Sequence, residues 1–283
     1  MLRTTIGSAL LCASLAWAAP PPAKPLVVLR PTLHQFEDGP PVAPTAGFAT
    51  GESVFFSFEV GGYQVSEDSQ VNLGCRLEAL DPQGVPLVET IRKEIKTKLS
   101  PEDKNWVPIV RESFLIPPLA LPGEYRIAIA VQDRLASQDA KAEIRFAVRG
   151  RSVEPSDTLL ARNVRFLRDE DDTQALSPPV YHPPCPVWVR FDIVGYKLGG
   201  QNRMQVTYGV TVLGPSGRAV YSQPQAAVEE GLSFYPKRYL PGTFSLNLDN
   251  TVRPGRYTIV LGLHDEVGHQ TVESRHEFSI EQP

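Results

Sequence analysis

Four side chains near the C terminus are the first group whose residue types suit metal chemistry. His264, Asp265, His269 and His276 lie on and around a predicted hairpin loop. Imidazole nitrogens and carboxylate oxygens are common ligands of zinc and copper. The alternative is that Asp265 caps a turn while the histidines are solvated. His264 and His269, which flank the loop, are therefore candidate metal ligands.

An acidic run, Asp169-Glu170-Asp171-Asp172, is the second group. Clustered carboxylates are the hard oxygen donors that calcium prefers, so Asp169, Asp171 and Asp172 are candidate calcium ligands. The spacing is not that of an EF-hand, and no glycine shapes the loop. A solvated acidic turn is the alternative interpretation.

Aromatic residues beside basic ones form the third group. One short stretch contains Phe234, Tyr235, Arg238 and Tyr239. Trp106 lies in the corresponding stretch of the first half of the chain, which the second half repeats as described below. Aromatic side chains and arginine are enriched in protein-recognition surfaces, and aromatic rings also stack on sugars. Packing at the end of a domain is the alternative. These five residues are the predicted partner-binding site, for a protein partner or, alternatively, a glycan.

Recognisable catalytic motifs are missing from the sequence. It contains no Gly-x-Ser-x-Gly, no phosphate-binding glycine-rich loop, no His-Glu-x-x-His and no paired-cysteine zinc spacing. We therefore expect a protein that is not an enzyme and that uses no cofactor. A metal-binding protein built on the His264 group is the less favoured alternative.

An internal repeat organises the elements that must position these residues. Residues 54–84 and 187–217 match without a gap, VFFSFEVGGY against VWVRFDIVGY at the start, at an offset of 133 residues. Residues 122–133 (PGEYRIAIAVQD) match residues 254–265 (PGRYTIVLGLHD) at an offset of 132. Self-similarity at a fixed period indicates one structural unit used twice.

Each copy shows the period-two alternation of β-strands, separated by Pro/Gly turns. One face of the second copy's strand carries apolar residues, while Arg190 and Asp192 point the other way. The apolar faces of the two strands comprise Val54, Phe56, Phe58 and Val60 in the first copy and Val187, Val189, Phe191 and Ile193 in the second. No stretch shows a helical period over a dozen residues.

The Pro-Gly-x-Tyr segments that begin the strands ending at Asp133 and Asp265 resemble the penultimate strand of immunoglobulin-like and fibronectin type III-like domains. The resemblance covers both halves and implies an all-β fold of two tandem immunoglobulin-like β-sandwich domains. The chain departs from true immunoglobulin domains because it lacks the inter-sheet cysteine pair. Cys75 and Cys185 are not equivalent in the repeat, so we expect free thiols.

Composition and the N terminus limit the function classes. The formal net charge of −4 is spread along the chain without a basic stripe, which argues against nucleic-acid binding. Residues 1–18 combine Arg3, a short apolar core and an Ala16-Trp17-Ala18 cleavage site, which is typical of a signal peptide. No other stretch is long enough to span a membrane. We expect domains at 19–150 and 151–283 in an exported protein, periplasmic or secreted, that binds or scaffolds a protein partner.

Overall fold

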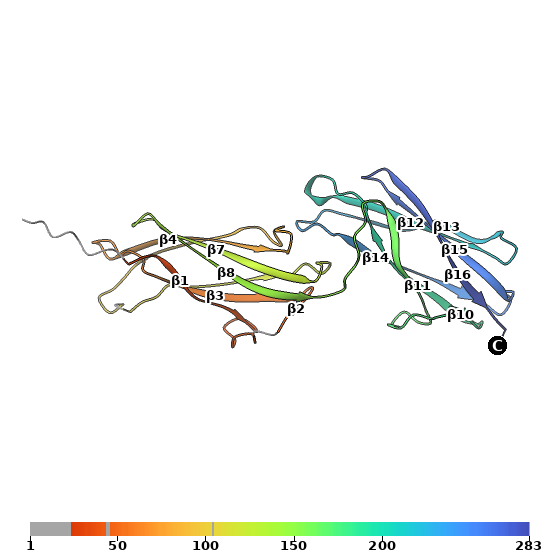
Figure 1. The fold of residues 1–283 in the computed structure, drawn as a ribbon, viewed down its shortest axis with the longest axis horizontal. Coiled ribbons are helices and arrows are strands. Elements are labelled where there is room, and N and C mark those ends of the chain that lie inside the picture. Colours follow the sequence, from red (N-terminus) through yellow and green to blue (C-terminus); the bar gives the residue numbers. More distant parts are fainter. Residues whose placement is uncertain (1–23, 44–45, 104, 283) are drawn as a thin grey trace, which may run out of the picture.

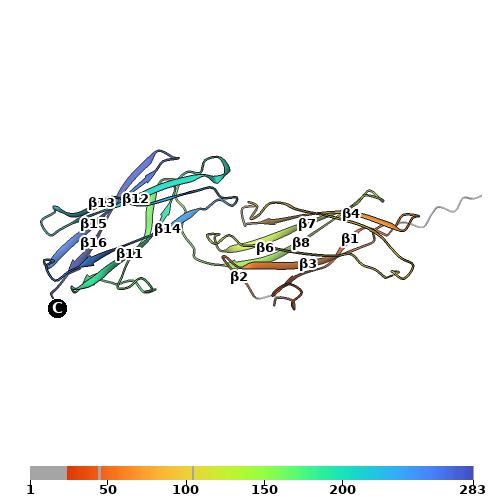
Figure 2. The same ribbon diagram turned by 180° about the vertical axis from the view of Figure 1, so that it is seen from behind.

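A computed structural model describes residues 24–43, 46–103 and 105–282, and it is all-β. The described residues form sixteen strands and one short 3-10 turn, Gly200–Asn202. Two β-sandwiches follow one another along the molecule (Figure 1), and the view from behind shows the same arrangement (Figure 2). The predicted all-β fold of tandem sandwiches is confirmed. The predicted signal peptide, 1–18, lies outside the described residues.

The N-terminal sandwich contains strands β1–β8. A three-stranded sheet has the order β1-β3-β6, and a five-stranded sheet has the order β2-β8-β7-β4-β5. The bounds are β1 Val27–His34, β2 Phe48–Ala49, β3 Ser53–Gly61, β4 Gln70–Leu80, β5 Ile91–Lys98, β6 Ile109–Leu115, β7 Gly123–Asp133 and β8 Gln138–Arg149. All pairs are antiparallel except β2 with β8.

The C-terminal sandwich repeats this topology with strands β9–β16. Its sheets have the orders β14-β11-β9 and β10-β16-β15-β12-β13. The bounds are β9 Leu160–Leu167, β10 Val180–Tyr181, β11 Cys185–Val194, β12 Met204–Leu213, β13 Ala219–Gly231, β14 Tyr239–Leu248, β15 Gly255–Asp265 and β16 Gln270–Ile280. The domain boundary at 150/151 stays a prediction; it falls in the segment between β8 and β9.

The alternating apolar residues build a core between the sheets of each sandwich, because successive side chains of a strand point to opposite faces. In β3 the burial alternates as the sequence predicts, with Val54, Phe56 and Phe58 buried. Cys75 is buried in the same core and Cys185 is half-buried, and both are free thiols. The pattern fails in the second half of β11, where both faces are buried.

The repeat also explains the two buried aspartates that end β7 and β15. Asp133 accepts a hydrogen bond from the backbone N–H of Gln64 at 2.6 Å, and Asp265 accepts one from that of Lys197 at 2.9 Å. Each carboxylate also accepts backbone N–H groups of its own hairpin loop. These aspartates therefore satisfy backbone donors that would otherwise be buried without a partner.

Candidate functional site

The loop between β13 and β14 places the predicted aromatic residues. The Tyr196 hydroxyl donates a hydrogen bond to the Lys237 carbonyl at 2.6 Å. The side-chain amide of Asn202 donates to the carbonyls of Ser233 and Phe234 at 3.1 and 2.7 Å. The C-terminal sandwich therefore fixes both halves of this loop.

Tyr235 projects from this loop into the N-terminal sandwich and joins its hydrophobic core. Its hydroxyl donates to the Asp81 carboxylate at 2.9 Å, and the Arg238 guanidinium donates to the same oxygen at 2.9 Å. The other oxygen of Asp81 accepts the backbone N–H groups of Gln83 and Val85, both at 2.8 Å. One buried carboxylate therefore shapes its own turn and ties the two sandwiches together.

The close packing raises the pKa values of two tyrosine hydroxyls. Burial raises the pKa of the Tyr235 hydroxyl, and the neighbouring Tyr125 and Asp81 raise it further. Burial also raises the pKa of the Tyr125 hydroxyl, while a hydrogen bond with Tyr235 acts in the opposite direction. Both tyrosines are therefore neutral hydrogen-bonding groups at ordinary pH.

A separate apolar cluster, the junction cluster, lies beside this polar contact. Val153 from the connecting segment packs with Val194 and Tyr239 of the C-terminal sandwich. Leu119 and Leu121, from the loop between β6 and β7 of the N-terminal sandwich, pack against them. The junction thus combines an apolar contact with an ion pair whose carboxylate is fully buried.

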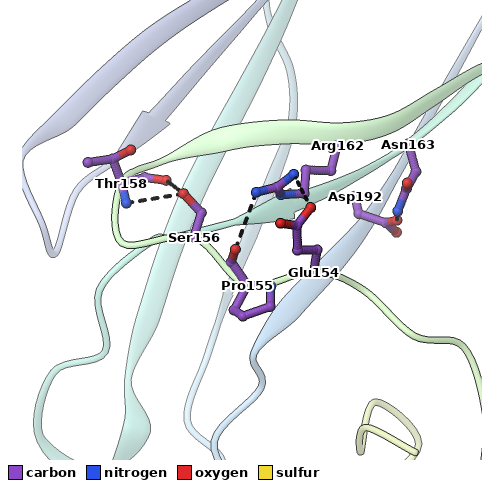
Figure 3. Close-up of polar contacts among 7 residues, drawn as sticks. All are labelled: Glu154, Pro155, Ser156, Thr158, Arg162, Asn163 and Asp192. Carbon is purple, nitrogen blue, oxygen red and sulfur yellow. Dashed lines mark hydrogen bonds and ion pairs between the residues drawn. The ribbon is translucent and has the colours of Figure 1, made fainter.

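The connecting segment is itself fixed to the C-terminal sandwich, as Figure 3 shows. Arg162 contacts the Glu154 carboxylate at 2.6 Å and the Pro155 carbonyl at 3.3 Å. Asp192 of β11 is fully buried; it accepts a hydrogen bond from Asn163 at 2.7 Å and pairs with Arg151. Asp192, which the sequence pattern places on the polar face of β11, is thus buried with polar partners from the connecting segment and from β9.

The structure places the five predicted partner-binding residues in different environments. Tyr235 and Tyr239 are buried in the junction, and Arg238 is paired with Asp81. Trp106 lies far from them in the chain and packs edge-on against Tyr63 of its own sandwich, with ring centroids 5.9 Å apart. Only Phe234 is largely exposed. Their role in binding a partner stays a prediction; an external partner reaches Tyr235 and Tyr239 only if the sandwiches separate.

The candidate metal ligands remain dispersed. His264 contacts Thr271 at 2.8 Å and Glu266 at 3.2 Å, whereas His276 contacts Ser274. The acidic run forms a turn in which Asp169 and Asp172 accept backbone N–H groups. Within residues 24–43, 46–103 and 105–282, no three His, Cys, Asp or Glu side chains are grouped closely enough to hold a metal ion.

The edge strand β13 carries an exposed apolar surface, which we call the β13 edge. It pairs only with β12, on one side. Proline and charged residues protect edge strands from pairing. From residue 224 onward β13 contains Pro224, Glu229 and Glu230, whereas residues 219–223 (AVYSQ) contain no proline and no charged residue. The exposed large apolar residues of the β13 edge and the loop after it are Val220, Tyr221, Val228, Leu232 and Phe234.

The equivalent edge strand of the N-terminal sandwich is protected. β5 also lies at the edge of its five-stranded sheet, and it carries Arg92, Lys93, Lys96 and Lys98. Lysines on an edge strand discourage pairing with other chains. The two edges therefore differ in their residues and in their extent, because β13 begins at Ala219, whereas β5 begins only at Ile91, the residue equivalent to Pro224.

Sequence reasoning missed three residues of the junction: Asp81, Arg151 and Asp192. Asp81 is the first residue of a Pro-Gly turn, where aspartate is common, so the sequence offered no reason to assign it a second role. The available signal was the repeat, because the second copy has Gly214 at the corresponding position and forms its turn without a carboxylate. An acid present in only one copy of a repeat indicates a role outside the shared fold.

No protein-family model matches the chain, and no curated protein matches it. Several solved structures match the chain. The C-terminal domain of the AgI/II polypeptide BspA of Streptococcus agalactiae is 9% identical, with 91% of this chain and 100% of that chain covered and a TM-score of 0.31. A tetra-tandem repeat from the extending region of a large adhesion protein is 12% identical, with 92% and 50% covered and a TM-score of 0.29. At these identities and TM-scores the matches carry no conclusion about function.

The described residues contain no helix that is both long enough and apolar enough to cross a membrane.

Proposed function

We propose that this chain is an exported, non-enzymatic binding or scaffold protein that recognises a protein partner through its C-terminal sandwich. The observation that carries the proposal is the β13 edge. Exposed apolar residues occur at the start of this strand, at Val228 and in the loop after it, and unpaired strand edges are a recurrent mode of peptide recognition. In the N-terminal sandwich the edge strand β5 carries lysines, and Leu87, which corresponds to Val220, is buried, so this exposure occurs in the C-terminal sandwich.

The junction supports a scaffold role. Two kinds of contact join the sandwiches: the hydrogen bonds of Tyr235 and Arg238 to Asp81, and the junction cluster. We expect them to favour one relative orientation. A rigid base reduces the conformational entropy lost when a partner binds. Export, to the periplasm or the outside of the cell, rests on the N-terminal sequence pattern.

Glycan binding is the second candidate. It needs exposed aromatic platforms, and Tyr221 and Phe234 are the exposed aromatic residues of the β13 edge. The same two side chains suit a protein partner, so the experiment must separate these two ligand classes.

Site-specific photo-cross-linking in the native cell tests the proposal. A photo-reactive phenylalanine analogue replaces Phe234 in one variant and Lys96, on the protected β5, in a matched control. We expect one dominant protein to be cross-linked from position 234 and not from position 96. Identical cross-linking profiles from the two positions, or no protein from either, would refute protein recognition at this edge; binding to insoluble polysaccharides would then favour the glycan candidate.

A further inference from the structure

A large cavity opens at the free end of the C-terminal sandwich. It has a volume of about 850 Å³ and lies between the two sheets, next to the first residues of β13. Its rim includes Arg253 and Gly214, and the nearby pair Gly255–Ile280 places it at the end where the chain terminates (Figure 1). The apolar residues of its wall are Val212, Val220, Leu246, Leu248, Val252, Tyr257 and Phe278.

The corresponding end of the N-terminal sandwich is closed. At the repeat offset, Leu87 corresponds to Val220; Leu87 is 2% exposed in the core, whereas Val220 is 63% exposed. The Leu87 N–H donates to the Ala79 carbonyl at 2.9 Å, which turns this segment inward. In the C-terminal sandwich the equivalent residues instead continue as β13 along β12.

The N-terminal sandwich also shows what covers such an end. Tyr235 of the following sandwich inserts there and contacts Asp81 and Tyr125. These two residues correspond to Gly214 and Tyr257, and both of those line the cavity. The end that receives an aromatic side chain in the first sandwich is thus the end that remains open in the second.

The charge at the open end differs from that at the junction. The carboxylate that binds Tyr235 and Arg238 at the junction belongs to Asp81, and the equivalent residue at the open end is Gly214, which has no side chain. No acidic residue lines the cavity. Arg253 is exposed at the rim and forms no ion pair with any described residue. A complementary partner therefore carries a carboxylate where the junction loop carries Arg238.

We propose that the cavity is a socket for a partner protein's aromatic side chain with a neighbouring carboxylate. The aromatic ring enters between the sheets as Tyr235 does at the junction, and the carboxylate pairs with Arg253. The volume suits a ring together with adjacent side chains, since ligand pockets of about 300–1,000 Å³ enclose drug-sized groups. This inference rests on the proposed function and specifies the chemistry of the partner.

Two synthetic peptides test the socket against the mature full-length chain. The first has the sequence of residues 231–239, and the second carries Lys237→Asp and Arg238→Asp within it. Fluorescence anisotropy of the labelled peptides reports binding. We expect the acidic peptide to bind about fivefold more tightly than the basic one, the scale of a single exposed ion pair.

Variants of the chain complete the test. Arg253→Glu should reverse the preference between the two peptides. Leu248→Trp, which fills the cavity, should weaken binding at least about tenfold, whereas Leu115→Trp, at an exposed site on β6, should not. Thermal melting checks that each variant is folded.

Three outcomes overturn the socket: equal affinity for both peptides, binding that survives Leu248→Trp in a folded protein, or no binding up to about 1 mM peptide, the weakest affinity that the assay reaches. None of these outcomes affects cross-linking from position 234. Failure of the socket and failure of the proposed function are therefore distinguishable.

Discussion

Asp81→Asn tests the junction, because it changes one carboxylate oxygen to an amide while preserving shape. The remaining oxygen still accepts the N–H groups of Gln83 and Val85. The new amide N–H₂ faces the Arg238 guanidinium, which can only donate, so this contact of 2.9 Å is lost. The Tyr235 hydroxyl loses its charged acceptor at 2.9 Å and can only accept from the neutral amide instead.

The magnitude follows from burial. A hydrogen bond to a charged group contributes about 1.5–3 kcal/mol. The Asp81 side chain is fully buried, but that of Arg238 is 30% exposed, so water compensates part of the loss. We expect the variant to lower the free energy of unfolding by about 2–4 kcal/mol, which corresponds to a fall of about 7–15 °C in Tm for a sandwich of about 130 residues.

Differential scanning calorimetry of the mature chain measures the effect, with Asp139→Asn as the control. Asp139 is exposed and belongs to the same sandwich, so its variant should change the free energy of unfolding by less than about 0.5 kcal/mol. A double-mutant cycle with Arg238→Met separates the contact between sandwiches from the turn; we expect a coupling energy above about 1 kcal/mol.

Two results would refute this reasoning. In the first, Asp81→Asn lowers Tm no more than Asp139→Asn does. In the second, the effects of Asp81→Asn and Arg238→Met add without coupling, which would mean that Asp81 stabilises only its own turn.

Three further predictions concern the repeat. Leu87→Ala should lower the free energy of unfolding by about 2–5 kcal/mol because it leaves a cavity, while Val220→Ala at the equivalent exposed position should change it by less than about 0.5 kcal/mol; urea unfolding compares them. Burial raises the pKa of the Cys75 thiol to about 11, so at about pH 8 a thiol-specific reagent should modify only the half-buried Cys185 in the folded mature chain; two reactive thiols before unfolding would contradict the buried position. Gly195→Ala should strongly destabilise the protein, because φ is +75° and the added Cβ would overlap a backbone carbonyl; an unchanged melting curve would contradict this.

Local sequence patterns are sufficient to identify the repeating unit. Period-two alternation places Val54 and Phe56 in the core, and the Pro-Gly turns set where strands end. These signals are local, since they depend on neighbouring residues and on the pleat of a strand, so they could be read without coordinates. The repeat then indicated that one sandwich topology occurs twice.

The differences between the two copies depend on contacts between residues that are far apart in the chain. Asp81 reads as an ordinary turn residue, yet its carboxylate meets Tyr235, which is 154 positions away in the chain. Leu87 and Val220 occupy equivalent positions in similar patterns, yet one is buried and the other lines an open cavity. Such contacts depend on how the two sandwiches are placed and on which path a strand takes at its edge, and neither is encoded in local periodicity.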